Sequence, residues 1–155
     1  MTSSFLRFTL LSLVVFITPL LHAQRERLTP EEIEIVEKKW PGTKKTGTGI
    51  RYIVQREGSG KAPVPGDRVA VLYVGTLLDG KQFDAHQDPK DPLVFRLGRE
   101  EVIVGWEQIL QMMKLNEKRL VIIPGSLAYG SRGRPPLIGR DAPLVFEMEL
   151  IQINP

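Results

Sequence analysis

The stretch EEVIVGWEQIL, residues 100–110, decides how the rest of the chain has to fold. Its apolar run leads into Gly105 and Trp106. A segment with helical periodicity extends over residues 104–113, so Trp106 lies in its first turn. A helix this short is not stable alone and has to be held by packing. Packing places Trp106 on the sheet side of the first helical turn, where its ring either fills a core or forms the floor of a pocket. The same argument turns Ile109 and either Met112 or Met113 inward.

Segments on both sides of this helix alternate between apolar and polar residues with a period of two, which is typical of strands covered on one face. Asp79-Gly80 is a hairpin signal, because tight hairpin turns need the positive φ that glycine adopts freely. The sequence therefore predicts an α+β fold, an antiparallel β-sheet wrapped around one short α-helix. Strands are expected within 50–57, 68–78, 93–97, 119–123 and 144–151.

The first 23 residues differ in kind from this domain. Phe8–Leu21 is predominantly apolar, Arg7 is the only charge, and Ala23 supplies the small residue of a cleavage site. These features predict that residues 1–23 are a secretory signal peptide. The alternative is a transmembrane anchor, but an anchor needs about 20 apolar residues and Pro19 interrupts this run.

A helical extension is expected between the leader and the domain. Thr29 and Glu32 have the spacing of a capping box, and one face of the helix that follows carries Ile33, Val36 and Trp40. This apolar face is expected to dock either on the domain or on a second subunit. We interpret TKKTGTG, residues 43–49, as a linker. The expected divisions are 24–46 for the extension with its linker and 47–155 for the domain.

The residue inventory excludes several kinds of chemistry. The chain has no cysteine, and His86 is the one histidine outside the leader, so no site with two or three histidine ligands can form within one chain. A serine–histidine–aspartate relay would need His86, which has no nucleophile-elbow pattern nearby and is interpreted as a solvated loop residue. A net charge of +3 gives no reason to expect nucleic acid. We therefore expect no strong nucleophile, no metal and no cofactor.

Aromatic residues are spread over the whole predicted domain. A set of this kind usually forms plain core, but two members favour an open pocket. Tyr129 stands in the Gly- and Pro-rich loop LAYGSRGRPP (127–136), where a buried hydrophobe is not expected. Trp106 lies where the first backbone N–H groups of a helix have no partner. The set comprises Tyr73, Phe83, Phe95, Trp106, Tyr129 and Phe146.

Four stretches together resemble the FKBP-type peptidyl-prolyl cis–trans isomerases. They are VAVLYVGTLLDGKQFDA (69–85), PLVFRLGREEVIVGWEQIL (92–110), AYGSRG (128–133) and APLVFEMELIQI (142–153). Their order and spacing match the family, and the resemblance covers residues 50–155. The succession of V-I-x-G-W, A-Y-G and L-V-F-x-x-E-L is highly specific. It implies the family's fold, an antiparallel sheet around one short helix.

The resemblance also implies a hydrophobic pocket that receives a proline ring, with Trp106 as its floor. It implies that Asp84 is the polar residue beside the pocket, and that the Tyr129 hydroxyl and the Ile103 backbone N–H each donate to a ligand carbonyl. Asp84, Tyr129 and Trp106 are thus the expected catalytic residues. The expected substrate-binding residues are Tyr73, Phe83, Phe95 (deeper), Val102, Ile103, Trp106, Leu137 and Ile138 (the apolar tip of an overhanging loop) and Phe146. Expected partners are proline-containing polypeptides and the macrolide ligands of the family.

The chain departs from the family at several positions. Pro89 replaces an arginine that pairs with Asp84 in some members, so Asp84 is expected to be less firmly held. Leu93 replaces a frequent aromatic at the pocket edge, and Asn116 replaces a turn glycine, which asparagine tolerates because it visits the left-handed region. The overhanging loop is basic because it carries Arg132, Arg134 and Arg140. These arginines are either solvated surface charges or they select substrates with acidic flanks.

Proline isomerisation fits a site that has no nucleophile. Rotating an X–Pro bond costs about 20 kcal/mol, and the twisted amide is less polar than the planar one. An apolar pocket therefore favours the transition state, and each tenfold gain in rate needs only about 1.4 kcal/mol. Asp84 acting as a general base is the alternative mechanism.

Two functions from different classes follow from this reading. The favoured one is an exported prolyl isomerase that assists folding, in a bacterial periplasm first and in a secretory lumen or outside the cell second. The alternative is a non-catalytic peptide-binding or chaperone module on the same scaffold. No stable membrane anchor is expected.

Overall fold

Seven strands form one antiparallel sheet in the computed structural model, which describes residues 27–155. The expected signal peptide, residues 1–23, lies outside the described residues. The order of the sheet is β1-β2-β6-β7-β3-β4, and the short strand β5 also pairs with β3. The strands are β1 (Lys44–Lys45), β2 (Arg51–Arg56), β3 (Arg68–Leu77), β4 (Gln82–His86), β5 (Leu93–Arg96), β6 (Lys118–Ile123) and β7 (Leu144–Ile153).

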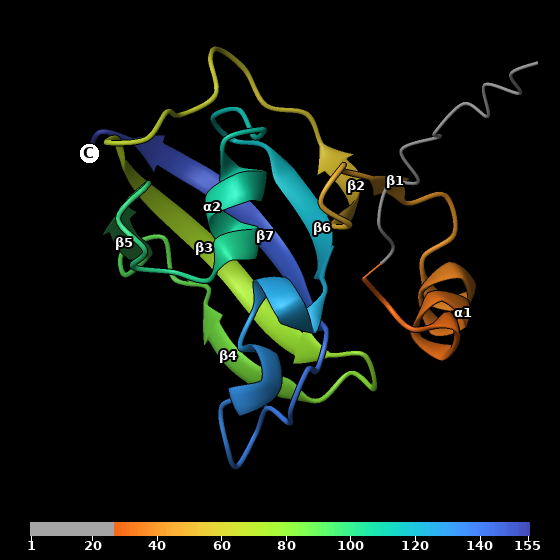
Figure 1. Ribbon diagram of the computed structural model, residues 1–155. Coiled ribbons are helices and arrows are strands. Elements are labelled where there is room, and N and C mark those ends of the chain that lie inside the picture. The colour runs from red at the N-terminus through yellow and green to blue at the C-terminus, as the bar shows by residue number, and fades with distance from the viewer. Residues whose placement is uncertain (1–26) are drawn as a thin grey trace, which may run out of the picture.

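Helix α2 (Val104–Leu110) lies across one face of this sheet (Figure 1). Its buried residues pack against the side chains of β3 and β7 that point to this face of the sheet. Together these residues form the main core. The expected α+β fold is confirmed, although α2 ends earlier than residue 113. The inward side chain is that of Met113, which is fully buried, whereas Met112 is exposed.

The hairpin at Asp79-Gly80 joins β3 to β4 as expected. Gly80 has a φ of 93°, and the backbone N–H of Leu77 donates to the Lys81 carbonyl at 3.0 Å. This turn sets the register of the hairpin, in which Tyr73 lies directly opposite His86. The end of β4 is therefore held beside the middle of β3.

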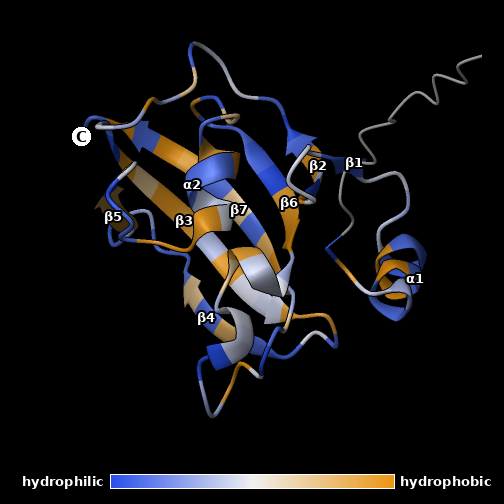
Figure 2. Cartoon of the chain, viewed as in Figure 1, coloured by the Kyte–Doolittle hydropathy of each residue, from blue (hydrophilic) through white to orange (hydrophobic). Residues whose placement is uncertain are grey.

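Helix α1 (Pro30–Lys39) packs on the opposite face of the sheet from α2. The capping box of Thr29 and Glu32 is present as expected. Successive apolar residues in β6 (residues 120–123) and at the start of β7 (residues 144–146), orange in Figure 2, point to both faces and give the sheet a second apolar face. This second cluster comprises Leu28, Val36, Leu120, Ile122 and Val145. The apolar face of the extension thus docks on its own domain.

The interpretation of residues 43–49 as a plain linker is wrong. Lys44 and Lys45 form β1, which pairs with the start of β2. The backbone N–H of Thr46 donates to the Ile50 carbonyl at 2.9 Å, and Gly49 closes the turn with a φ of 91°. Backbone pairing creates this edge strand, and its polar residues give no alternation by which the sequence could have revealed it.

Two single turns of 3₁₀ helix follow β6 and shape the loop beside α2. They are η1 (Gly125–Leu127) and η2 (Gly130–Arg132). Asn116 adopts a φ of 62°, the left-handed conformation that its place in a turn requires. Within the described part of the chain, no helix has the length and apolar character needed to cross a membrane.

Candidate functional site

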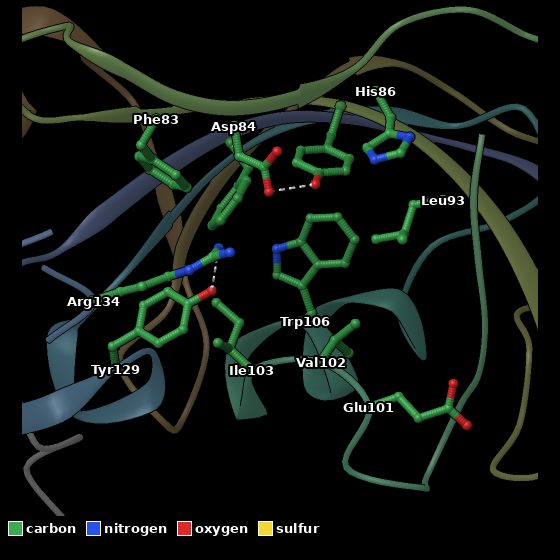
Figure 3. A pocket seen from close by; sticks show the side chains of 12 residues that line it. Phe83, Asp84, His86, Leu93, Glu101, Val102, Ile103, Trp106, Tyr129 and Arg134 are labelled. Carbon is green, nitrogen blue, oxygen red and sulfur yellow. Dashed lines mark hydrogen bonds between the residues drawn. The ribbon is translucent and has the colours of Figure 1, made fainter. Parts of the chain in front are cut away.

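A cavity of about 320 Å³ opens between β4, the start of α2 and the loop that follows β6 (Figure 3). Eight of its twelve lining residues are apolar or aromatic, and four carry polar or charged side chains. The lining residues are Tyr73, Phe83, Asp84, His86, Leu93, Glu101, Val102, Ile103, Trp106, Tyr129, Arg134 and Phe146.

Trp106 forms the floor of this cavity and is held there by other aromatic rings. Its ring meets Tyr73 edge to face, with 4.8 Å between centroids, and Phe146 in the same way at 5.2 Å. Phe95 packs 6.0 Å away. Edge-to-face pairs at these distances are favourable beyond the area they bury, so the floor is rigid.

Two glycines allow this aromatic cluster to close. A Cβ on Gly105 would lie 2.4 Å from Cγ2 of Ile123, so only glycine lets the first turn of α2 lie so near β6. A Cβ on Gly75 would lie 2.7 Å from the Phe83 ring and 3.0 Å from that of Phe146. All three distances are shorter than ordinary van der Waals contacts. The geometry of the pocket therefore depends on glycine at positions 75 and 105.

Asp84 is held by a neighbouring hydroxyl. The Tyr73 hydroxyl donates to Oδ2 of Asp84 at 2.8 Å, and the backbone N–H of Ala85 donates to Oδ1 at 3.0 Å. Burial, and then the bond to Asp84, raise the pKa of Tyr73 above its usual range, so this hydroxyl stays protonated as a donor. Tyr73 and the Ala85 N–H thus hold the carboxylate of Asp84, and the expectation that Pro89 leaves it less firmly held than in relatives with an arginine there stays a prediction.

Three donors at the cavity have capacity for a ligand. The indole Nε1 of Trp106 is buried without a hydrogen-bond partner among the described residues. The backbone N–H of Ile103, just before α2, donates to no other atom of residues 27–155. The Tyr129 hydroxyl accepts from Nη1 of Arg134 at 3.4 Å, which leaves its own hydrogen free to donate.

The structure brings eight of the eleven expected site residues together around this one cavity. Phe95 lies behind Trp106 and is buried, so it supports the floor. Leu137 and Ile138 line a smaller cavity of about 130 Å³ beside the first, which also includes Phe83 and Asp84.

Leu93 lines the cavity as expected, whereas sequence reasoning missed His86, Glu101 and Arg134 as lining residues. The interpretation of His86 as a solvated loop residue is wrong. Its ring stacks on Tyr73 with 5.6 Å between centroids, and its Nδ1 lies 3.2 Å from the Asp91 carbonyl oxygen. The hairpin register could have revealed this, because residues directly opposite each other on paired strands are in contact.

Nowhere in residues 27–155 do three His, Cys, Asp or Glu side chains gather as a metal ion would require.

The architecture is thus an open antiparallel sheet around a short helix, with a cavity floored by Trp106 between them. Residues 59–151 match the family described as FKBP-type peptidyl-prolyl cis-trans isomerase, and the chain belongs to that family.

Relatives and solved structures agree with this assignment. Human peptidyl-prolyl cis-trans isomerase FKBP4 is 41% identical over 133 residues, 85% of this chain and 28% of that protein. FKBP-type peptidyl-prolyl cis-trans isomerase FkpA of Escherichia coli is 43% identical over 117 residues, 76% of this chain and 42% of that protein. The crystal structure of FkpA superposes with a TM-score of 0.71 at 42% identity, covering 81% of this chain and 58% of that one.

A peptidyl-prolyl cis-trans isomerase structure from Pseudomonas syringae gives a TM-score of 0.70 at 40% identity, covering 81% of this chain and 92% of that one. The chain spans less than half the length of the curated relatives named above.

Proposed function

We propose that this protein is a peptidyl-prolyl cis–trans isomerase that binds the proline of its substrate in the cavity above Trp106. The observation that carries the proposal is the aromatic cavity itself, in a chain of the FKBP-type family. A proline ring needs apolar contact on several sides, and Trp106, Tyr73 and Phe146 offer it at three angles.

The physical basis of catalysis would be the loss of amide polarity during rotation. A planar X–Pro amide is polar because of resonance, and the twisted amide is less so. Transfer into an apolar cavity from which water is excluded therefore disfavours the ground state more than the transition state. No proton has to move, which agrees with a site in which the Asp84 carboxylate is already bonded to Tyr73 and Ala85.

Hydrogen bonds would fix the substrate around this apolar contact. The Ile103 N–H and the Tyr129 hydroxyl are donors with free capacity, and carbonyl groups flank every proline in a peptide. Asp84 orients the Tyr73 ring, which forms part of the wall. In this proposal Trp106 provides the floor, Tyr129 holds a carbonyl, and Asp84 fixes the surrounding wall.

A protease-free assay tests the proposal. The exchange between cis and trans forms of a short X–Pro peptide is followed by NMR with catalytic amounts of protein, with and without a macrolide ligand of the family. Accelerated exchange that the macrolide blocks is the expected result. Binding of the peptide without acceleration would instead support the alternative, a non-catalytic peptide-binding or chaperone module.

Tyr129→Phe is expected to lower kcat/KM by tenfold at most. The substitution removes one hydrogen-bond donor and keeps the ring, and one such bond contributes about 0.5–1.5 kcal/mol. The measurement is kcat/KM on the same peptide, after circular dichroism shows an unchanged fold. A loss of a thousandfold or more would contradict the role assigned here and make Tyr129 an essential chemical group.

We further propose that the helical part of residues 24–46 is an appendage and that residues 47–155, completed by β1, are the catalytic unit, because all lining residues of the cavity follow residue 72. A protein that begins at Thr43 and so retains β1 is expected to keep its kcat/KM. Its free energy of unfolding should fall by about 2 kcal/mol or more, since Leu28 and Val36 no longer cover the outer face. A shortened protein that folds but has lost its activity would contradict this division.

Export is proposed on the pattern of the leader alone. Residues 1–23 have the charge, apolar run and small final residue of a signal peptide. A periplasmic location is favoured, with a secretory lumen or the outside of the cell second. N-terminal sequencing of protein recovered from the exported fraction should begin at or near Gln24, whereas a retained Met1 would indicate an anchor.

A further inference from the structure

Arg134 is the cation that the fold places at the cavity. Its backbone is fixed at the base of a tight loop, because its N–H and C=O bond to those of Ile138 at 2.9 and 3.0 Å. Its guanidinium carbon lies 5.8 Å from the centroid of the Tyr129 ring, and Nη1 donates to the Tyr129 hydroxyl. Figure 3 shows the side chain reaching between Asp84 and Tyr129 toward the indole nitrogen of Trp106.

This side chain stands on the wall between two cavities. Phe83, Asp84 and Arg134 line both the cavity of about 320 Å³ and its neighbour of about 130 Å³. Consecutive Cα atoms are only about 3.8 Å apart. A peptide with its proline ring on Trp106 therefore has a directly neighbouring residue within reach of this wall and of the guanidinium.

The charge of Arg134 has no carboxylate partner in the part of the chain that the structure describes. No acidic group of residues 27–155 lies within 4 Å of it. The two acids that line the cavity are already engaged, since Asp84 accepts from Tyr73 and Ala85, and Glu101 accepts from the Arg96 N–H at 3.4 Å. The guanidinium keeps several N–H donors beyond the one given to Tyr129.

We propose that Arg134 determines substrate specificity by binding a carboxylate on the residue next to the proline. The preferred substrates are then segments in which Asp or Glu directly flanks proline. This inference rests on the proposed isomerase function and names its substrate class. A guanidinium suits the role because its planar fork matches a carboxylate with two hydrogen bonds. Arg132 and Arg140, in the same loop, line neither cavity.

The test compares peptides that differ only in charge at one flank. The exchange assay is run at low salt on peptides with Glu or Gln before the proline, and on a second pair with Glu or Gln after it. The full-length protein is expected to prefer Glu to Gln by about threefold in kcat/KM at one of the two flanks, the size of an ion pair that is open to solvent. The ratio should fall toward one as salt is raised.

Three variants make the comparison specific. Arg134→Gln is expected to bring the Glu/Gln ratio to one, Arg134→Lys to keep part of it, and Arg140→Gln to leave it as in the unmodified protein. A ratio of one at both flanks of the unmodified protein overturns the inference, and so does a preference that survives in Arg134→Gln. Failure of the proposed function looks different, because then no peptide, including the Gln references, isomerises faster than without protein.

Discussion

Replacing Trp106 with leucine is expected to lower kcat/KM by about ten- to a hundredfold. The indole ring is the floor against which the proline ring would lie, and it is held by Tyr73 and Phe146. Leucine keeps apolar volume but loses the flat surface, and full burial of one large apolar side chain contributes about 1.5–3 kcal/mol. A loss of that size in transition-state binding corresponds to the expected change in rate.

A second variant at the same position separates the ring from its N–H group. Trp106→Phe keeps an aromatic face and removes the indole Nε1, which is buried without a partner among the described residues. It should retain more activity than Trp106→Leu if apolar contact dominates. Both variants need a measured free energy of unfolding, because Trp106 also belongs to the core. Activity of folded Trp106→Leu close to that of the unmodified protein would contradict its role as the floor.

Arg119→Met is expected to lower the free energy of unfolding by about 3–5 kcal/mol. Arg119 and Glu117 form an ion pair inside the protein, with side chains only 7% and 2% exposed. Nη2 of Arg119 also donates to the Met112 carbonyl at 2.6 Å, and the guanidinium lies 4.6 Å from the centroid of the Tyr52 ring. Removing the cation leaves the buried Glu117 carboxylate without an opposite charge, with the Lys114 backbone N–H as its remaining donor at 2.9 Å, which explains the size of the expected loss.

Urea unfolding of Arg119→Met beside Lys118→Met provides the matched comparison. Lys118 pairs with Glu147 at 3.3 Å, but those side chains are 39% and 49% exposed. Exposed pairs contribute about 0–1 kcal/mol, so the neighbouring substitution should change stability little. Equal effects of the two substitutions would show that burial of the Glu117–Arg119 pair does not set its contribution.

The sequence predicted the fold well where the residue pattern itself reflects burial. Val69, Val71 and Tyr73 alternate along β3 because one face of that strand meets the core, and Asp79-Gly80 marks its hairpin. The short helical segment predicted Trp106 on the sheet side of its first turn, where the ring is buried, and the structure adds that Gly105 is needed for the approach to β6. Resemblance to the family then supplied the expected roles of the pocket residues.

Features that depend on tertiary contact could not be predicted in this way. Strand β1 is made of lysines and pairs through its backbone alone. His86 lines the cavity because the register of the hairpin puts it against Tyr73, and Arg134 does so because its loop closes on Ile138. The burial of Glu117 and Arg119 runs against their residue types, since charged side chains are rarely buried unless paired.

The cavity is proposed to act by apolar contact and hydrogen bonding, without transfer of a proton. The most direct test is kcat/KM of Asp84→Asn on one X–Pro peptide. The asparagine side-chain oxygen can still accept from Tyr73, so the wall is kept while the carboxylate that accepts from Tyr73 is lost. The account predicts activity within about tenfold of the unmodified protein. Loss of nearly all activity in folded Asp84→Asn, while Trp106→Leu remains active, would contradict it and identify Asp84 as a general acid or base.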